Sequence, residues 1–133
     1  MHPLKTISVS IRRPFQAVYD FLAKPKNFPL WAAGLGKMTQ EGNGQWVTET
    51  EQGLMTLLFT NENPFGIVDH YVIPPTGDAL YIPMRVIAND GSADVLFTLF
   101  KTAEMTDVIF ERDAGLIEAD LNTLKTHLEA QTL

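Results

Sequence analysis

Apolar residues recur at regular spacings along most of the chain, and these spacings predict its secondary structure. Residues 5–11 alternate between the two faces of a strand, with the apolar face formed by Ile7, Val9 and Ile11. Pro14 suits the first position of a helix. The helical spacing of three and four then predicts a helix over 15–23 with an apolar stripe of Phe15, Val18, Tyr19 and Leu22. A second short helix is predicted around residues 27–31.

Strand and turn patterns fill the middle of the chain. Turn residues at 42–44, 74–78 and 90–91 separate apolar or alternating runs. The predicted strands cover residues 37–40, 45–51, 54–60, 66–73, 80–89 and 93–100. Hairpins in this succession form an antiparallel meander.

A long helix is predicted at the C-terminus, over residues 106–129. Its apolar residues step by three and four along the whole length: Phe110, Ala114, Ile117, Leu121, Leu124 and Leu128. A helix of this length crosses an entire small sheet. The order of elements therefore predicts an α+β fold, in which a curved antiparallel sheet wraps around the C-terminal helix and encloses a cavity. The length of 133 residues favours a single domain over 1–133.

Composition narrows the range of functions. A net charge of −6 disfavours nucleic acid as a partner. No window approaches the roughly 20 apolar residues that span a bilayer, so no membrane insertion is expected. The N-terminal residues lack the apolar segment of a signal peptide, and there is no cysteine, which fits a cytoplasmic location. The three histidines lie far apart, so neither a metal site nor a cofactor is predicted.

Four segments resemble the Bet v 1-like or START-type helix-grip superfamily (SRPBCC), and most of all its small bacterial polyketide cyclase/dehydrase-like branch. They are residues 9–31 (VSIRRPFQAVYDFLAKPKNFPLW), 66–72 (GIVDHYV), 83–98 and 118–129, which contains ADLNTLKTHLE. The resemblance implies a seven-stranded antiparallel sheet curled around the C-terminal helix, with an apolar cavity between them. It supplies no invariant catalytic motif.

The sharpest candidate for chemistry is the run Asp69-His70-Tyr71. Neighbouring strand residues point to opposite faces, so these three side chains cannot all line one cavity. An inward His70 would suit proton transfer or a hydrogen bond to a ligand. His70 could equally be a hydrogen-bonded core residue, or exposed. Asp69 is the alternative catalytic candidate.

Besides His70, Tyr71 and four further residues are candidates for ligand binding. Arg85 alternates with apolar residues, which places it in solvent; on a covered sheet face it would instead be an inward cation for a ligand carboxylate or enolate. Trp31 follows the short helices and is either a lid over the cavity or a cap on the core. Met84 and Phe97 either line the cavity or fill the core.

The leading hypothesis is a module that binds a small, mainly hydrophobic molecule in the internal cavity, as some lipid-binding proteins do. One alternative is a cyclase or dehydratase that acts on an aromatic or polyketide-like substrate by acid–base chemistry. A second alternative is a protein-interaction module. Half-exposed aromatic strand positions are compatible with a homodimer.

Overall fold

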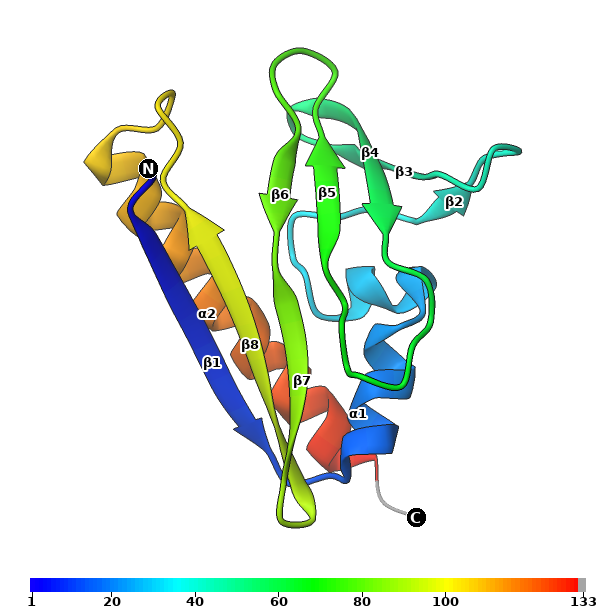
Figure 1. Cartoon of the computed structure of the whole chain (residues 1–133). Coiled ribbons are helices and arrows are strands. Elements are labelled where there is room, and N and C mark those ends of the chain that lie inside the picture. Colours follow the sequence, from blue (N-terminus) through cyan, green and yellow to red (C-terminus); the bar gives the residue numbers. More distant parts are fainter. Residues whose placement is uncertain (132–133) are drawn as a thin grey trace.

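The computed structural model describes residues 1–131 and contains a strongly curved sheet, two short helices and one long helix (Figure 1). The helices are α1 (Phe15–Leu22), the 3-10 helix η1 (Pro25–Leu30) and α2 (Asp107–Ala130). The strands are β1 (Leu4–Ile11), β2 (Thr39–Gln40), β3 (Trp46–Thr50), β4 (Gly53–Phe59), β5 (His70–Ile73), β6 (Leu80–Ile82), β7 (Met84–Asn89) and β8 (Ser92–Phe100).

All strand pairs are antiparallel, and they form two hydrogen-bonded groups, β1-β8-β7 and β2-β3-β4-β5-β6. The predicted single strand over 80–89 is broken at Pro83, which has no N–H to give to a sheet. The break does not separate the groups, because the Pro83 carbonyl still accepts from the N–H of Thr98 on β8 (3.0 Å). With β6 and β7 taken as one bent strand, the sheet has the seven antiparallel strands that the resemblance implied.

Strand β8 lies between β1 and β7 and shows the clearest pattern of burial. Alternate residues along it are buried: Ala93, Val95, Phe97 and Leu99. The hairpin that connects it to β7 turns at Asp90 and Gly91, whose φ angles of 47° and 88° are those of a tight two-residue turn. The predicted alternation is therefore confirmed on this strand, and its buried face points toward α2.

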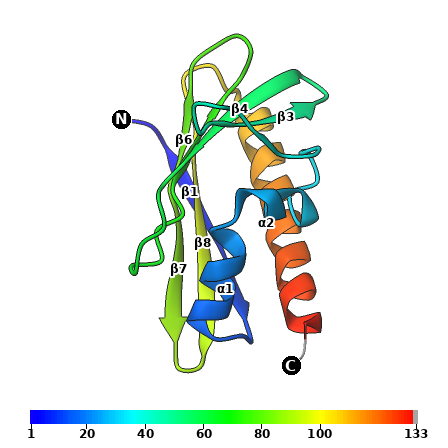
Figure 2. The same cartoon turned by 90° about the vertical axis from the view of Figure 1, so that its right-hand side faces the viewer.

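Helix α2 covers the concave side of the sheet along its length (Figure 2). The hydroxyl of Thr106 accepts from the N–H of Ile109 (3.1 Å) and caps the helix. Its predicted stripe is confirmed: Ile117 is half-buried, and the other members are buried, namely Phe110, Ala114, Leu121, Leu124 and Leu128. Burial of this stripe against the sheet is what fixes the position of the helix.

The two short helices lie where β1 leaves the sheet, between the sheet and the C-terminal half of α2 (Figure 2). Pro14 is the N-cap of α1, one position before the predicted site. The buried face of α1 contributes Val18, Tyr19 and Leu22 to the core, and η1 contributes Phe28. Among the described residues, no helix combines the length and the hydropathy that a membrane span requires.

Candidate ligand pocket

A pocket of about 180 Å³ lies between the concave face of the sheet, η1 and α2. We call it the inner pocket. Its wall is almost wholly apolar, and two ionisable side chains, His70 and Asp120, interrupt it. The lining residues are Phe28, Trp31, Ala32, Gly34, Leu35, Leu57, His70, Val72, Ile82, Phe97, Ile117 and Asp120.

A second cavity, of about 580 Å³, lies at the N-terminal end of α2, and we call it the end cleft. It is lined by the β5–β6 hairpin, the β8–α2 connection and Ile109 of α2, and it includes polar groups such as Gln52, Asp78 and Glu104. Val72 lines both cavities. The inner pocket is the better candidate site, because the buried His70 and the half-buried Asp120 both line it, whereas most polar residues of the end cleft are exposed.

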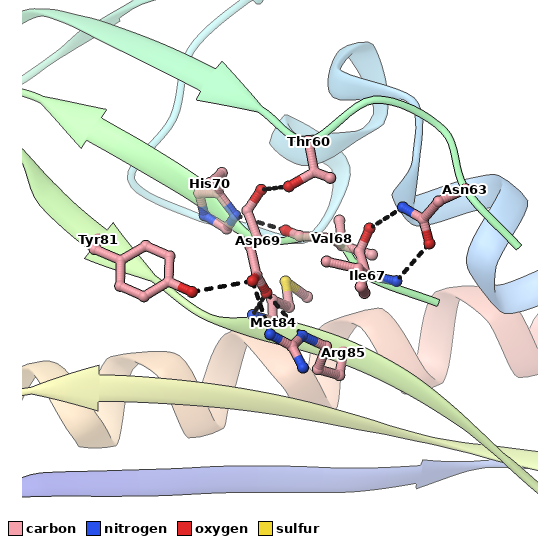
Figure 3. A network of polar contacts seen from close by, with 9 residues as sticks. All are labelled: Thr60, Asn63, Ile67, Val68, Asp69, His70, Tyr81, Met84 and Arg85. Carbon is pink, nitrogen blue, oxygen red and sulfur yellow. Dashed lines mark hydrogen bonds and ion pairs between the residues drawn. The ribbon is translucent and has the colours of Figure 1, made fainter. Parts of the chain in front are cut away.

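His70 is buried on the inner wall, which answers the question that the sequence left open. Its ring is surrounded by other aromatic rings, with centroids 5.5 Å from Phe28, 5.4 Å from Phe59 and 6.3 Å from Phe97. Its Nδ1 lies 3.0 Å from the carbonyl oxygen of Val68 (Figure 3). A carbonyl only accepts, so the ring proton resides on Nδ1, and Nε2 carries a lone pair.

The pKa of His70 is lowered from its ordinary value. Burial among the aromatic rings is the main cause, because it disfavours the charged imidazolium; the bond to Val68 and the charge of Asp69 oppose it. His70 is therefore neutral at neutral pH, and it can act as a base or as a hydrogen-bond acceptor.

We expect this burial to make the protein less stable in mild acid. Between the lowered folded pKa and the unfolded value near 6.5, the unfolded chain binds a proton that folded His70 does not. The free energy of unfolding should therefore fall as the pH drops below about 6.5, by up to about 1.4 kcal/mol per pH unit. Urea titrations at pH 7.0, 6.0 and 5.5 measure this slope.

The variant His70→Phe provides the comparison for this pH dependence, since it keeps an aromatic ring and removes the titrating group. Its slope between pH 5.5 and 6.5 should be smaller than that of the parent protein. An unchanged slope would show that His70 is not the group responsible. Asp69, on the outer face, also has a lowered pKa, but its effect on the free energy of unfolding falls below this pH range, because a carboxyl group ordinarily titrates near pH 4.

Trp31 closes the inner pocket on the side of η1. Its ring centroid lies 5.0 Å from that of Phe28, and the residue is only 3% exposed. Its indole Nε1 has no hydrogen-bond partner among residues 1–131. The position of Trp31 is compatible with both predicted roles, a lid over the cavity and a cap on the core, because the ring is packed in the core and also lines the pocket.

Asp120 is a pocket residue that the sequence analysis did not single out. It lines the inner pocket, and its Oδ1 accepts from the backbone N–H of Ala33 (3.3 Å). Partial burial raises the pKa of this carboxyl, and the Ala33 bond opposes the rise. The signal available in the sequence was its place beside Leu121 and three residues after Ile117, at the margin of the apolar stripe.

The other catalytic candidate, Asp69, turns away from the pocket to the outer face (Figure 3). Its carboxylate accepts from Nε and Nη2 of Arg85 (2.9 and 2.8 Å), the N–H of Met84 (2.8 Å) and the hydroxyl of Tyr81 (3.1 Å). Burial alone would raise the pKa of Asp69, but these bonds outweigh it and hold the pKa below its ordinary value. This network joins β5 to the bend at Pro83, and it engages Arg85 outside the pocket.

Of the remaining candidates for ligand binding, one lines the inner pocket and two lie elsewhere. Phe97 lines the inner pocket beside His70 and Trp31. Met84 is fully buried in the core and is not a lining residue. Tyr71 is 45% exposed on the outer face, where its ring contacts Tyr81 at 5.2 Å. The structure thus brings together three of the six predicted binding residues, and it adds Asp120, Phe28 and the half-buried Ile117.

Residues 1–131 contain no group of three or more histidine or acidic side chains close enough to hold a metal ion. The inner pocket itself offers one imidazole and one carboxylate. What the pocket can do chemically is to exclude water from an apolar guest, and to offer that guest one imidazole and one carboxyl group.

Solved structures show where else this fold occurs. A START superfamily protein from Mycobacterium smegmatis matches with a TM-score of 0.70 at 11% identity, over 99% of this chain and 100% of that one. An Aha1 protein from Colwellia psychrerythraea matches at 0.75 and 16%, over 96% of each chain. The Zhui aromatase/cyclase from Streptomyces sp. R1128 matches at 0.71 and 15%, over 97% and 94%.

These likenesses span nearly the whole chain and establish its fold as the Bet v 1-like, START-type helix-grip fold. No sequence-family model matches the chain, and no curated protein matches it in sequence. At identities this low, the shared property is the fold, and function has to be argued from the pocket.

Proposed function

We propose that this protein binds a small, mainly apolar molecule in the inner pocket. The observation that carries the proposal is a pocket of about 180 Å³ whose wall is built from aromatic and aliphatic side chains and is covered by α2. Proteins with this Bet v 1/START-like fold typically bind hydrophobic ligands, which supports the proposal. Burial of ligand hydrocarbon would drive the binding.

The size of the pocket suggests the probe with which to test it. A cavity of roughly 150 Å³ accommodates benzene, so a single substituted ring matches this one. Burying about 150 Å² of ring surface at about 25 cal/mol per Å² contributes ~4 kcal/mol. This corresponds to a Kd on the order of 1 mM. We therefore choose toluene as the probe and amide chemical shifts as the readout, because shifts report such weak binding residue by residue.

A toluene titration should produce saturable shifts around the inner pocket. The variant Ala32→Leu adds three carbons to the pocket wall and should weaken binding by about ten-fold or more, as expected when a small cavity is filled. The matched control Ala103→Leu makes the same change in the end cleft and should leave the Kd unchanged. Absence of saturable shifts, or sensitivity to Ala103→Leu alone, would contradict the proposal.

A second candidate is acid–base catalysis of the cyclase or dehydratase type on an aromatic or polyketide-like substrate. The observation that favours it is that a neutral imidazole, His70, and a carboxyl with a raised pKa, Asp120, line one pocket. Turnover of a β-hydroxy ketone should then fall by about a hundred-fold or more in His70→Phe. Turnover that survives this change would rule out His70 as the base.

A further inference from the structure

Strand β1 lies at the end of the group β1-β8-β7, so one of its two long edges faces away from β8 (Figure 1). In an antiparallel ladder, only alternate residues bond to a given neighbouring strand. The N–H of Lys101 donates to the carbonyl of Pro3 (2.8 Å), which shows that the odd-numbered residues of β1 bond to β8. The backbone N–H and C=O groups of Leu4, Thr6 and Ser8 therefore point to the outer edge.

This outer edge is closed at one end and open at the other. At its C-terminal end, Nζ of Lys125 donates to the carbonyl of Ser10 (2.6 Å), and the N–H of Arg12 donates to the carboxylate of Glu129 (2.8 Å). Within residues 1–131, no group outside β8 bonds to the backbone of residues 4–8, and the outward residues of this segment are exposed. Because an unpaired edge is a template for another strand, this segment is available for pairing.

We infer that residues 4–8 pair with the same segment of a second copy of this chain, antiparallel and about a twofold axis at Thr6. In this register Thr6 lies opposite Thr6 of the second copy, and Leu4 lies opposite Ser8, so the outward N–H and C=O groups of all three residues are bonded. An axis at Ser8 would instead place Ser10 opposite Thr6, although Lys125 already occupies the carbonyl of Ser10.

The charges of the segment permit this pairing with a second copy. Lys5 is the only charged residue in the segment, and the register places it opposite Ile7 of the second copy. Its Nζ is already paired with Glu111 of its own chain (2.8 Å), so like charges do not lie opposite each other across the axis. The two β1-β8-β7 groups would become one continuous sheet. The inference goes beyond the proposed function, because it requires nothing in the inner pocket.

Single cysteines test the register, because the chain has no cysteine of its own. Residues that bond directly across an antiparallel pair have Cα atoms about 5.5 Å apart, a separation that a disulfide can span. Thr6→Cys should therefore form a cross-linked dimer with oxidised glutathione. Ser8→Cys is the matched control, because its two copies would lie about 13 Å apart along the strands. Equal cross-linking of the two variants, or cross-linking of Ser8→Cys alone, would overturn the inference.

The unaltered protein tests whether the pairing occurs at all. Analytical ultracentrifugation should show a monomer–dimer equilibrium. Amide hydrogen exchange at Thr6 and Ser8 should slow by several-fold as the protein concentration rises, whereas exchange at Ile7, which bonds to β8, should not depend on concentration. A protein that stays monomeric at about 1 mM, or a dimer whose Thr6 and Ser8 amides are not protected, would overturn the inference and leave the proposed function standing.

Two substitutions at Thr6 separate its backbone from its side chain. Thr6→Pro removes the outward N–H, which an edge strand tolerates, and should weaken the dimer by about ten-fold or more. Thr6→Ala loses the same hydroxyl contact to Thr98 (2.9 Å) but keeps the N–H, so it should leave the dimer largely intact. Equal effects of the two substitutions on the dimer would contradict pairing through the backbone of β1.

Discussion

Leu124→Ala is expected to lower the free energy of unfolding by about 3.5 kcal/mol, which is the middle of the range for leucine truncation in a packed core. Leu124 lies on α2, is fully buried, and belongs to the main core that α2, the sheet and α1 form together. Truncation removes apolar contact on all sides of the side chain, and the helix cannot close the space without leaving the sheet. Urea denaturation with an unchanged m-value measures the loss.

The same helix offers a matched control for this prediction. Leu116 is 58% exposed and lies outside the buried stripe of α2, and Leu116→Ala should change stability by less than about 0.5 kcal/mol. The contrast tests which face of α2 the sheet holds. Similar losses in the two variants would mean that the helix is not packed through the stripe that contains Leu124.

Gly66→Ala is expected to destabilise the protein by about 3 kcal/mol or more, for two reasons that add. Gly66 has a φ of +77°, which an L-residue adopts at a cost of about 1–2 kcal/mol. A Cβ at this position would also lie 2.3 Å from the carbonyl oxygen of Val86 and 2.9 Å from the ring of Phe15. The backbone cannot easily yield, because the N–H of Val86 donates to the Gly66 carbonyl (2.9 Å).

Gly42→Ala is the control for this substitution, because no atom outside its chain neighbours lies within 4 Å of the added Cβ and its φ is not positive. Its effect should stay within about 0.5 kcal/mol. Thermal unfolding of both variants and of the parent protein measures the two losses of stability. A loss of less than 1 kcal/mol in Gly66→Ala would contradict the close approach of this segment to β7.

The elements with strong periodicity could be predicted from the sequence. Strand β8 and helix α2 each bury one face, and the alternation of apolar residues or the helical stripe shows which residues form it. The same reasoning established that His70 and its two neighbours face opposite ways. It could not decide which of these faces is concave, because the curvature of the sheet arises from long-range strand pairing and not from local pattern.

The parts of the site that could not be predicted depend on contacts between distant segments. Asp120 enters the pocket because the backbone of Ala33, 87 residues away, lies against α2. Asp69 and Arg85 pair because the bend at Pro83 brings β7 beside the start of β5. The spacing of residues along the chain predicts neither of these two pairings. The alternation did place Arg85 on the outer side, and the structure agrees with that interpretation.

Intermolecular nuclear Overhauser effects from bound toluene to methyl groups test most directly whether a guest enters between the sheet and α2. Our account predicts contacts to Leu57 and Ile82 on the sheet and to Ile117 on the helix at the same time, because these three residues line the inner pocket from opposite sides. Contacts confined to Met105 and Ile109 of the end cleft, or no contacts at saturating toluene, would contradict it.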